Sequence, residues 1–362
     1  MRMLTEQNIE DMALGAAVLG TGGGGDPYIG KLMALQALRE FGPVRMLDVD
    51  EINDEEMVVP AAMMGAPTVM IEKIPSGKEL LSAFKDLASY IGRPITAVMS
   101  IEAGGLNSMM PISVAASMNL PLVDCDGMGR AFPEIQMVTH TIFGVSATPM
   151  TIADEKGNSA LINTINNRWT ETFSRSIAID MGGSALIALY AATGKQLKEL
   201  AVRGTMTFAE EIGKTVRAAR RQESNPVDAV RRVTNGFLLF KGKIVDIQRR
   251  TVGGFARGEA HLDGIEQYAG SKLEIDFQNE HLVAIRDGRY VATVPDLIAI
   301  LDVDTGEPIT TEAIRYGFRV AVIGTPCDAR WRLPKGLELA APRYFGYDVD
   351  YVPIEDLVAQ SN

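Results

Sequence analysis

Short apolar runs alternate with helix-like segments along the first half of the chain, and this alternation most restricts the folds open to it. Strand-like runs cover residues 57–64, 96–101 and 120–124, and helix-like stretches at 77–91 and 107–118 separate them. Strands and helices that alternate in this way pack as a parallel or mixed sheet covered by helices. We therefore predict a three-layer α/β domain at the N-terminus.

Two helices are also predicted before the first strand. Thr5 is a suitable N-cap for a helix over residues 5–19, in which apolar residues repeat on one face. Asp26 followed by Pro27 is a strong start signal for a second helix, which we expect to end near Phe41.

The pattern changes after about residue 165. Helical segments lead into a stretch in which Leu273, Ile275 and Phe277 alternate with charged residues, as in a half-buried strand. The helices are predicted at residues 183–193, 207–221 and 226–235. We place the domains at residues 1–168 and 169–362, the second being α+β with a β-sandwich or small barrel at about 237–303.

Composition limits the functional classes. The 362 residues are 46% hydrophobic and 22% charged, as in ordinary globular proteins, and the net charge of −11 argues against nucleic acid as a partner. Two cysteines are too few for a disulfide framework, and neither a signal pattern nor a membrane-spanning run is visible. We expect a cytoplasmic protein that binds a small molecule and no membrane.

Three glycine-rich turns, each with an acidic residue, stand out at residues 21–27 (TGGGGDP), 101–107 (IEAGGLN) and 124–130 (DCDGMGR). Such loops occur mainly where backbone approaches a ligand or bends sharply. The first precedes a helix, so its amides can bind an anion or a polarised carbonyl; a flexible interhelical turn is the alternative. The residues concerned are Gly22, Gly23, Gly24 and Gly25.

The third turn ends a predicted strand. Because side chains alternate along a strand, Asp124 and Asp126 should face one way and Cys125 the other. Two such carboxylates can share a metal or divide acid and base roles, although a turn stabilised by Arg130 is the alternative. Glu102, in the second turn, is a further acid at an expected strand end.

No standard cofactor motif is present. The three histidines form no zinc signature, but His140 together with Asp126 or Cys125 is a candidate metal site assembled from separate segments. Residues 25–32 miss the P-loop pattern because Leu32 replaces the hydroxyl residue that holds Mg²⁺. No nucleotide cofactor is expected.

Taken in order, GTGGGGDP, E-x-GG-x-N, DCDGMGRAFPEIQM, TVGGF, QNEHLVA and TVPDLI resemble a bacterial family named after S-methyl-thiohydantoin desulfurase. The resemblance covers nearly the whole chain and implies an N-terminal α/β domain and a β-rich C-terminal domain. It also implies metal-assisted hydrolysis at a hydantoin-like ring, in which water replaces a methylthio group. Family members are associated with hydantoinase- and oxoprolinase-type enzymes.

The resemblance suggests a role for each candidate. Water attack on a ring carbon needs a general base, or a metal that lowers the pKa of water. The catalytic candidates are Asp124, Asp126 and Glu102; the substrate-binding candidates are Gly22, Gly23, Gly24, Gly25, Asp26, Asn107 and Arg130; the metal candidates are His140 and Cys125. Arg130 would hold a substrate carboxylate, and zinc is the expected metal.

Two functions follow. The first is a hydrolase of a small cyclic amide, imide or thiohydantoin. The second is a non-catalytic subunit that binds a metabolite and partners a hydantoinase-type enzyme; a homo-oligomer is the other assembly we consider. Arg203, Arg257 and Glu280 are lower-ranked candidates for a cleft between the domains.

Overall fold

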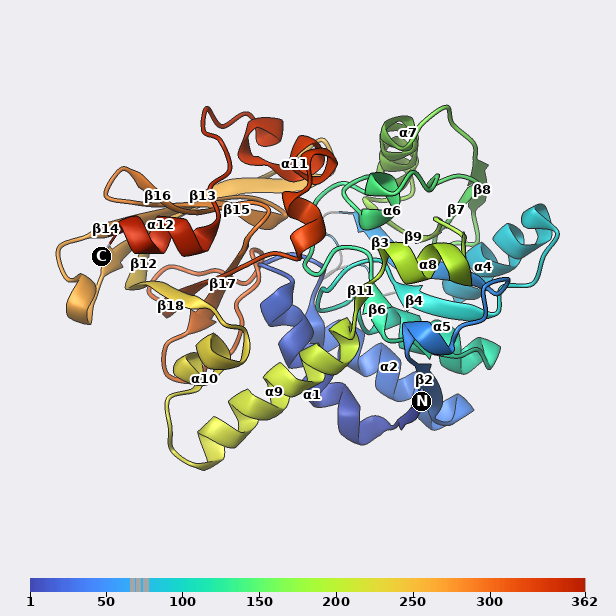
Figure 1. Ribbon diagram of the computed structural model, residues 1–362, viewed down its shortest axis with the longest axis horizontal. Helices are drawn as coiled ribbons and strands as arrows, with labels where there is room; N and C mark the ends of the chain where they lie inside the picture. Colours follow the sequence, from blue (N-terminus) through green and yellow to red (C-terminus); the bar gives the residue numbers. More distant parts are fainter. Residues whose placement is uncertain (66–68, 70–72, 74–77, 362) are drawn as a thin grey trace.

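A mixed α/β half and a sheet-rich half lie side by side in the computed structural model, which describes residues 1–65, 69, 73 and 78–361 (Figure 1). This arrangement confirms the predicted fold class. No helix in these ranges is long and apolar enough to cross a membrane.

Nine strands form the first sheet within the described residues, in the order β1-β2-β5-β4-β3-β9-β7-β8 with β10 beside β3. Strands β2, β5, β4 and β3 run parallel, and the remaining pairs are antiparallel. The strands are β1 (Arg2–Leu4), β2 (Val44–Leu47), β3 (Met57–Gly65), β4 (Ala97–Ser100), β5 (Leu122–Val123), β7 (Met150–Ala153), β8 (Ser159–Ile162), β9 (Ser184–Ala188) and β10 (Ala192–Thr193).

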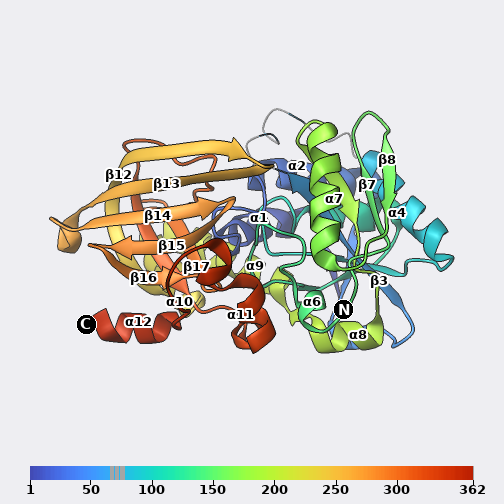
Figure 2. The ribbon, with the colours of Figure 1, turned by 90° about the horizontal axis from the view of Figure 1, so that it is seen from above.

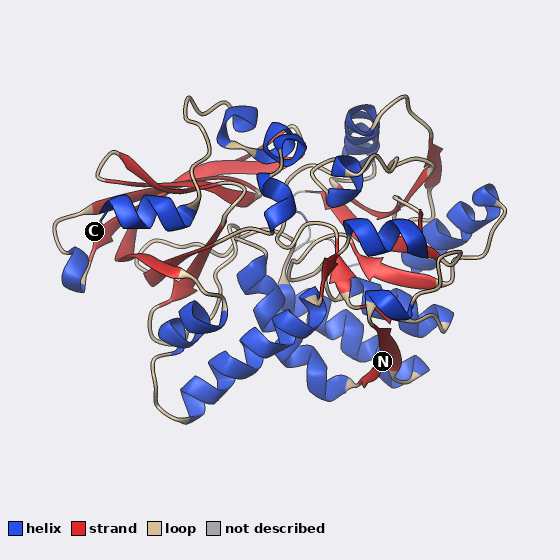
Figure 3. Ribbon diagram, in the orientation of Figure 1, coloured by secondary structure: helices blue, strands red, loops and turns tan. Residues whose placement is uncertain are grey.

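Helices cover both faces of this sheet (Figure 3). Strand β3 shows why, because Val58 and Ala62 enter one apolar core while Val59 and Ala61 enter another. Both faces therefore bury apolar side chains, as a parallel sheet requires. The helices of this half are α1 (Glu6–Leu19), α2 (Pro27–Phe41), α4 (Lys78–Ile91), α5 (Met110–Met118), α6 (Thr139–Ile142), α7 (Asn167–Asp180), α8 (Gly194–Leu200) and α9 (Thr205–Arg221), with a 3₁₀ turn at Val49–Glu51.

The two N-terminal helices begin where the sequence predicted. Thr5 caps α1 through a reciprocal capping box with Asn8. The carboxylate of Asp26 accepts hydrogen bonds from the amides of Tyr28 at 2.7 Å and Ile29 at 3.3 Å, which fixes the start of α2. The glycine loop is thus held between two well-defined helix ends.

The helix predicted at residues 183–193 is wrong, because this segment forms β9 and β10. Strand β9 is buried along its whole length between β3 and β7. A strand buried on both faces has no alternating pattern, so its alanine-rich sequence was not distinguishable from a buried helix. The boundary predicted at residue 168 therefore falls within the sequence of the first sheet and not between the two sheets.

The second sheet is antiparallel throughout and has the order β16-β15-β14-β13-β12-β18-β17. Its end strand β17 also contacts β15 and β16, so the sheet curls into a half-barrel, whose broad strands are seen in Figure 2. This curled sheet agrees with the predicted β-rich second domain with a sandwich or small barrel, and it extends past residue 303 to β18. Its strands are β12 (Phe237–Val252), β13 (Phe255–Gly264), β14 (Lys272–Gln278), β15 (Glu280–Arg286), β16 (Arg289–Thr293), β17 (Leu297–Asp302) and β18 (Arg319–Thr325).

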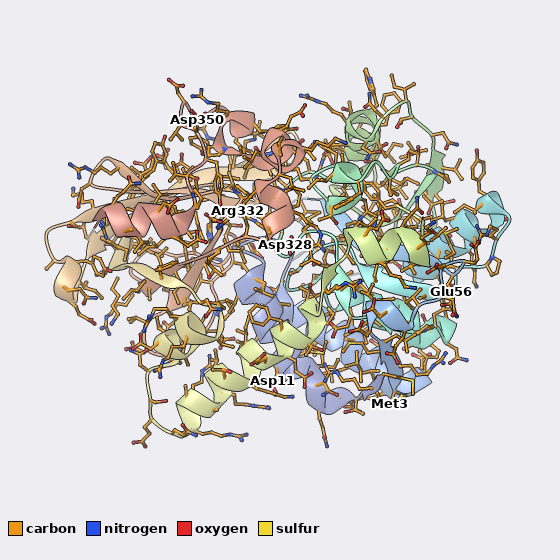
Figure 4. All side chains as sticks on the ribbon, in the orientation of Figure 1. Met3, Asp11, Glu56, Asp328, Arg332 and Asp350 are labelled. Atoms are coloured by element: carbon orange, nitrogen blue, oxygen red, sulfur yellow. The ribbon has the colours of Figure 1, made fainter. Side chains whose placement is uncertain are left out.

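Short helical elements complete the second half. They are α10 (Pro226–Val233), α11 (Pro334–Ala340) and α12 (Ile354–Ser361), with 3₁₀ turns at Glu266–Tyr268, Ala329–Arg332 and Pro342–Phe345; a small two-stranded sheet joins β6 (Cys125–Asp126) to β11 (Val202–Arg203). Near the middle of the molecule, Asp328 and Arg332 mark the segment that contacts the first half (Figure 4). Between them, the Trp331 indole donates a 2.6 Å hydrogen bond to the carbonyl of Met128.

Candidate active site

A pocket lies between the first sheet and the turn that joins β14 to β15. About 560 Å³ of space that no protein atom fills lies in it, part of which is open to solvent. The α/β half supplies the glycine loop, the end of β3 and the loop after β4, and the sheet-rich half supplies Asn279 and Glu280. The lining residues are Gly24, Gly25, Ala62, Met63, Met64, Gly65, Ile101, Glu102, Asn107, Met128, Phe132, Pro133, Glu134, Ile135, Arg175, Ile187, Asn279 and Glu280.

The glycine loop allows the two domains to approach. A Cβ atom on Gly23 would lie 2.0 Å from Oε1 of Glu280, and one on Gly24 would lie 2.4 Å from the Cα atom of Gly104. Gly24 also has a φ of +74°, which strains any residue with a side chain. Both positions therefore require glycine for reasons of space.

The residues of the glycine loop differ in what they contact. The amide of Gly24 donates to the carboxylate of Glu280, so the anion that it contacts is a side chain of the second domain. Gly25 lines the pocket, whereas Gly22 packs against the ring of His281. The carboxylate of Asp26 caps α2 and does not line the pocket, so its predicted contact with substrate has no geometric support.

Glu102 and Asn107 line the pocket as a hydrogen-bonded pair. The amide nitrogen of Asn107 donates to Oε1 of Glu102 at 2.6 Å, and the backbone amide of Phe132 donates to Oε2 at 3.3 Å. Asn107 is held in turn by the amide of Met63, which donates to its Oδ1 at 2.9 Å. Burial raises the pKa of Glu102 to about 7, although these donors and Arg130 favour the ionised form. At neutral pH this carboxyl can therefore both accept and release a proton.

Glu280 faces the same pocket from the second domain. Its side chain is buried, and its Oε2 has no hydrogen-bond partner among the described residues. Burial, followed by the charge of Glu102, raises the pKa of Glu280 well above its ordinary range, although Arg130 opposes this shift. Two buried carboxyl groups near one guanidinium favour a state in which one of the two acids is protonated.

Arg130 lies behind this pair and is fully buried. Its Nε donates to the carbonyl of Ala131, one Nη donates to the carbonyls of Pro295 and Asp296, and the other donates to Thr21 Oγ1 and the carbonyl of His281. All five N–H groups therefore have protein acceptors. The geometry gives no support to the predicted clamp on a substrate carboxylate, because the N–H groups of Arg130 are used by acceptors of both halves.

Asp124 and Asp126 do not lie in the pocket. The carboxylate of Asp124 accepts from the amides of Met206 at 3.0 Å and Thr207 at 3.1 Å, at the start of α9. Asp126 accepts from the amide of Gly129 at 2.7 Å, and burial raises its pKa to about 7. The strand predicted to place both acids on one side is broken, because β5 ends before Asp124 and β6 pairs elsewhere. The geometry gives no support to a shared site with Glu102.

The predicted metal ligands also lie outside the pocket. His140 is buried, its two ring nitrogens have no hydrogen-bond partner in the described part of the chain, and burial lowers its pKa to about 3. Burial raises the pKa of the Cys125 thiol, which disfavours the thiolate that binds metals. Neither residue belongs to a ligand cluster: the described residues bring three potential ligand atoms within 4.8 Å of one another only at Glu259, Glu274 and Asp276. His140 and Cys125 therefore do not fit a zinc site as they stand.

Glu280, a lower-ranked candidate in the sequence, lines the pocket. Of the three residues considered for an interdomain cleft, Arg203 pairs with Asp50 at 2.8 Å, and Arg257 lies 5.7 Å from the ring of Phe255. The available signal for Glu280 was its position directly after Asn279, at the end of an alternating strand. That signal does not identify the glycine loop as the segment that faces Glu280, because the loop lies more than 250 residues earlier in the sequence.

Family models match both halves of the chain. The model described as S-Me-THD-like, N-terminal domain, matches residues 7–164, and that described as S-Me-THD-like, C-terminal domain, matches residues 165–354. A crystal structure of a protein from Chromobacterium violaceum is 25% identical, covers 98% of this chain and 100% of its own, and superposes with a TM-score of 0.81. A search of curated proteins found no match.

Proposed function

Because the chain belongs to the S-Me-THD-like family, we propose that it hydrolyses a small cyclic amide or imide of the hydantoin or S-methyl-thiohydantoin type. The observation that carries this proposal is the pair formed by Glu102 and Glu280, two buried carboxyl groups in one pocket. The remaining wall of the pocket is largely apolar, as suits the face of a small ring.

The carboxyl pair can supply both proton transfers of a hydrolysis. The ionised member accepts a proton from water as the oxygen attacks a ring C=N or C=O carbon. The protonated member donates its proton to the leaving nitrogen or sulfur, so that one proton enters the pair and one leaves it. Proton transfer by positioned groups of this kind contributes about 10²- to 10⁴-fold to the rate.

The neighbouring groups hold the pair in place. Asn107 and the amide of Phe132 orient Glu102, and the amide of Gly24 orients Glu280. Arg130 supplies one positive charge without entering the pocket, which limits the cost of burying a carboxylate beside a second acid. Zinc remains an expectation from the family, and no step proposed here depends on it.

Glutamine substitution at each member of the pair tests the proposal. We expect Glu280→Gln and Glu102→Gln each to lower kcat/KM by at least about 10²-fold on hydantoins or S-methyl-thiohydantoins, with circular dichroism unchanged. Glu40→Gln, at the exposed end of α2, is the matched control and should retain full activity.

The pH profile separates a catalytic loss from a general one. Wild type should show a limb in kcat/KM near pH 7, from the raised pKa of Glu102, and that limb should be absent in Glu102→Gln. Full activity in both glutamine variants would refute the carboxyl mechanism. No turnover by wild type alone, together with copurification of a larger enzyme, would instead support a non-catalytic binding subunit.

A further inference from the structure

Helix α7 carries large apolar side chains on its exposed side, and it lies at the front of the α/β half in Figure 2. Trp169 and Phe173, one turn apart, are 45% and 48% exposed, and their ring centres lie 5.4 Å apart. Ile179 is 48% exposed near the end of the helix. Apolar side chains gathered on one surface in this way are typical of a contact with another molecule. The outer face of α7 consists of its exposed residues Arg168, Trp169, Thr172, Phe173, Ser176, Ile179 and Asp180.

The two hydroxyl residues of the outer face do not need water. Thr172 donates to the carbonyl of Arg168 at 3.1 Å, and Ser176 donates to the carbonyl of Thr172 at 3.0 Å. Both hydroxyls therefore have acceptors within the helix, and covering them would leave no unpaired donor. The outer face can thus be buried along its middle without a polar penalty.

The charged residues of the outer face lie at its two ends and have opposite signs. Arg168 is in the first turn of α7, and Asp180 is its last residue. Neither forms an ion pair with a residue that the structure describes, although the guanidinium of Arg168 lies 6.0 Å from the ring centre of Tyr344. A cation at the start of a helix and an anion at its end both oppose the helix dipole. Within one chain these charges are therefore unfavourably placed, and a partner of complementary charge would stabilise them.

A second copy of α7 that runs in the opposite direction has the required charges. Residues 168 and 180 are equally far from residue 174, so a two-fold axis near residue 174 brings Arg168 to the same end of the pair as the partner's Asp180. The same axis brings Trp169 to the end that holds the partner's Ile179, and it brings Phe173 beside the partner's Phe173. A parallel pair would instead gather like charges at both ends. The charge pattern therefore favours a second copy in antiparallel orientation.

We propose that two copies of this chain associate through the outer face of α7, antiparallel to each other about a two-fold axis. The inference does not depend on the proposed reaction. Three partly exposed apolar side chains per copy give an interface smaller than the about 1,600 Å² of a standard specific complex, so we expect a Kd of about 1–100 μM. Because Arg175, on the inner side of α7, lines the pocket, this interface lies one helix away from the candidate active site.

Sedimentation velocity of the full chain at about 1–100 μM tests the proposal. We expect the mass to rise with concentration from the 39.1 kDa of one chain towards twice that value. Phe173→Glu should weaken the dimer at least about tenfold, with circular dichroism unchanged, because it places two carboxylates beside each other at the axis. Phe41→Glu is the matched control, since Phe41 is 51% exposed at the end of α2, and it should leave association unchanged.

Reversing the charges at the two ends tests the orientation. Arg168→Asp alone should weaken the dimer by about threefold or more, because two acids would then share each end of the pair. Adding Asp180→Arg to the same chain should restore the wild-type Kd within about twofold, since opposite charges again share each end.

A wild type that stays monomeric up to about 100 μM would overturn the inference. A dimer unaffected by Phe173→Glu, or a double variant in which association is not restored, would overturn it as well. Binding of a larger enzyme to a monomeric chain through Trp169 and Phe173 would also overturn it and assign this face to a different protein.

Discussion

Replacing Glu102 by glutamine should change how stability depends on pH. The carboxyl is fully buried, and its pKa rises from an ordinary 4.5 to about 7, chiefly because burial disfavours the charged form. Above about pH 4.5 the unfolded chain loses this proton while the folded chain keeps it. The free energy of unfolding therefore falls as pH rises through this window and levels off above about pH 7.

The size of the effect follows from the shift. A rise from 4.5 to about 7 corresponds to about 3 kcal/mol at most, of which about 2 kcal/mol falls between pH 5 and pH 8. Glutamine has no proton to lose. Between pH 5 and pH 8, the free energy of unfolding of Glu102→Gln should therefore rise by about 2 kcal/mol relative to that of wild type. The variant also loses the acceptor for the Phe132 amide, which costs about 1 kcal/mol. That cost is the same at both pH values and cancels in the comparison.

Urea unfolding, followed by tryptophan fluorescence near pH 5 and near pH 8, measures the four free energies needed. Glu40→Gln controls for the loss of one acidic side chain from the exposed surface. If the free energies of unfolding of Glu102→Gln and wild type differ by the same amount at both pH values, within about 0.5 kcal/mol, the carboxyl of Glu102 is not held protonated by its surroundings. The mechanism proposed for the pair would then lose its physical basis.

Two other substitutions address the interface between the domains. Gly23→Ala should leave most of the secondary structure intact but lower kcat/KM by at least about tenfold, because its Cβ would lie 2.0 Å from Oε1 of Glu280 and displace that carboxyl; wild-type kinetics in this variant would contradict the close approach. Arg130→Met should destabilise the protein by about 3 kcal/mol or more in urea unfolding, because it removes five hydrogen bonds and leaves buried acids without their cation; a loss below about 1 kcal/mol would contradict this role.

Local signals in the sequence predicted the local structure well. Thr5 and Asp26 start helices because a capping side chain needs only the next three residues, and the alternating residues of β14 mark a half-buried strand. Strand β9 was misread because a strand covered on both faces shows neither period. Capping residues and apolar periods depend on neighbours in the sequence, so they do not show which other segments pack against a strand.

The candidate site also contains residues that local signals predicted and residues placed by contacts between distant segments. Glu102 and Asn107 were predicted from their position after a strand, and they do face the pocket. Asp124 and Asp126 have the same local setting, but their carboxylates accept hydrogen bonds from the start of α9, some 80 residues later: Asp124 from the Met206 amide and Asp126 from the Thr205 hydroxyl. Glu280 reaches the pocket only because the second domain packs on the glycine loop. Contacts between distant segments decide which acids remain available for chemistry.

The position of β9 affects the order in which the protein can fold during synthesis. This strand lies between β3 and β7, yet it follows residue 164, where the first family model ends. A nascent chain released only to that point contains β3 and the β7–β8 hairpin, with an unpaired edge on each. Unpaired edges of this kind readily bind other chains. The edges of β3 and β7 can therefore be buried only after Ser184–Ala188 has been synthesised, beyond the end of the first family model.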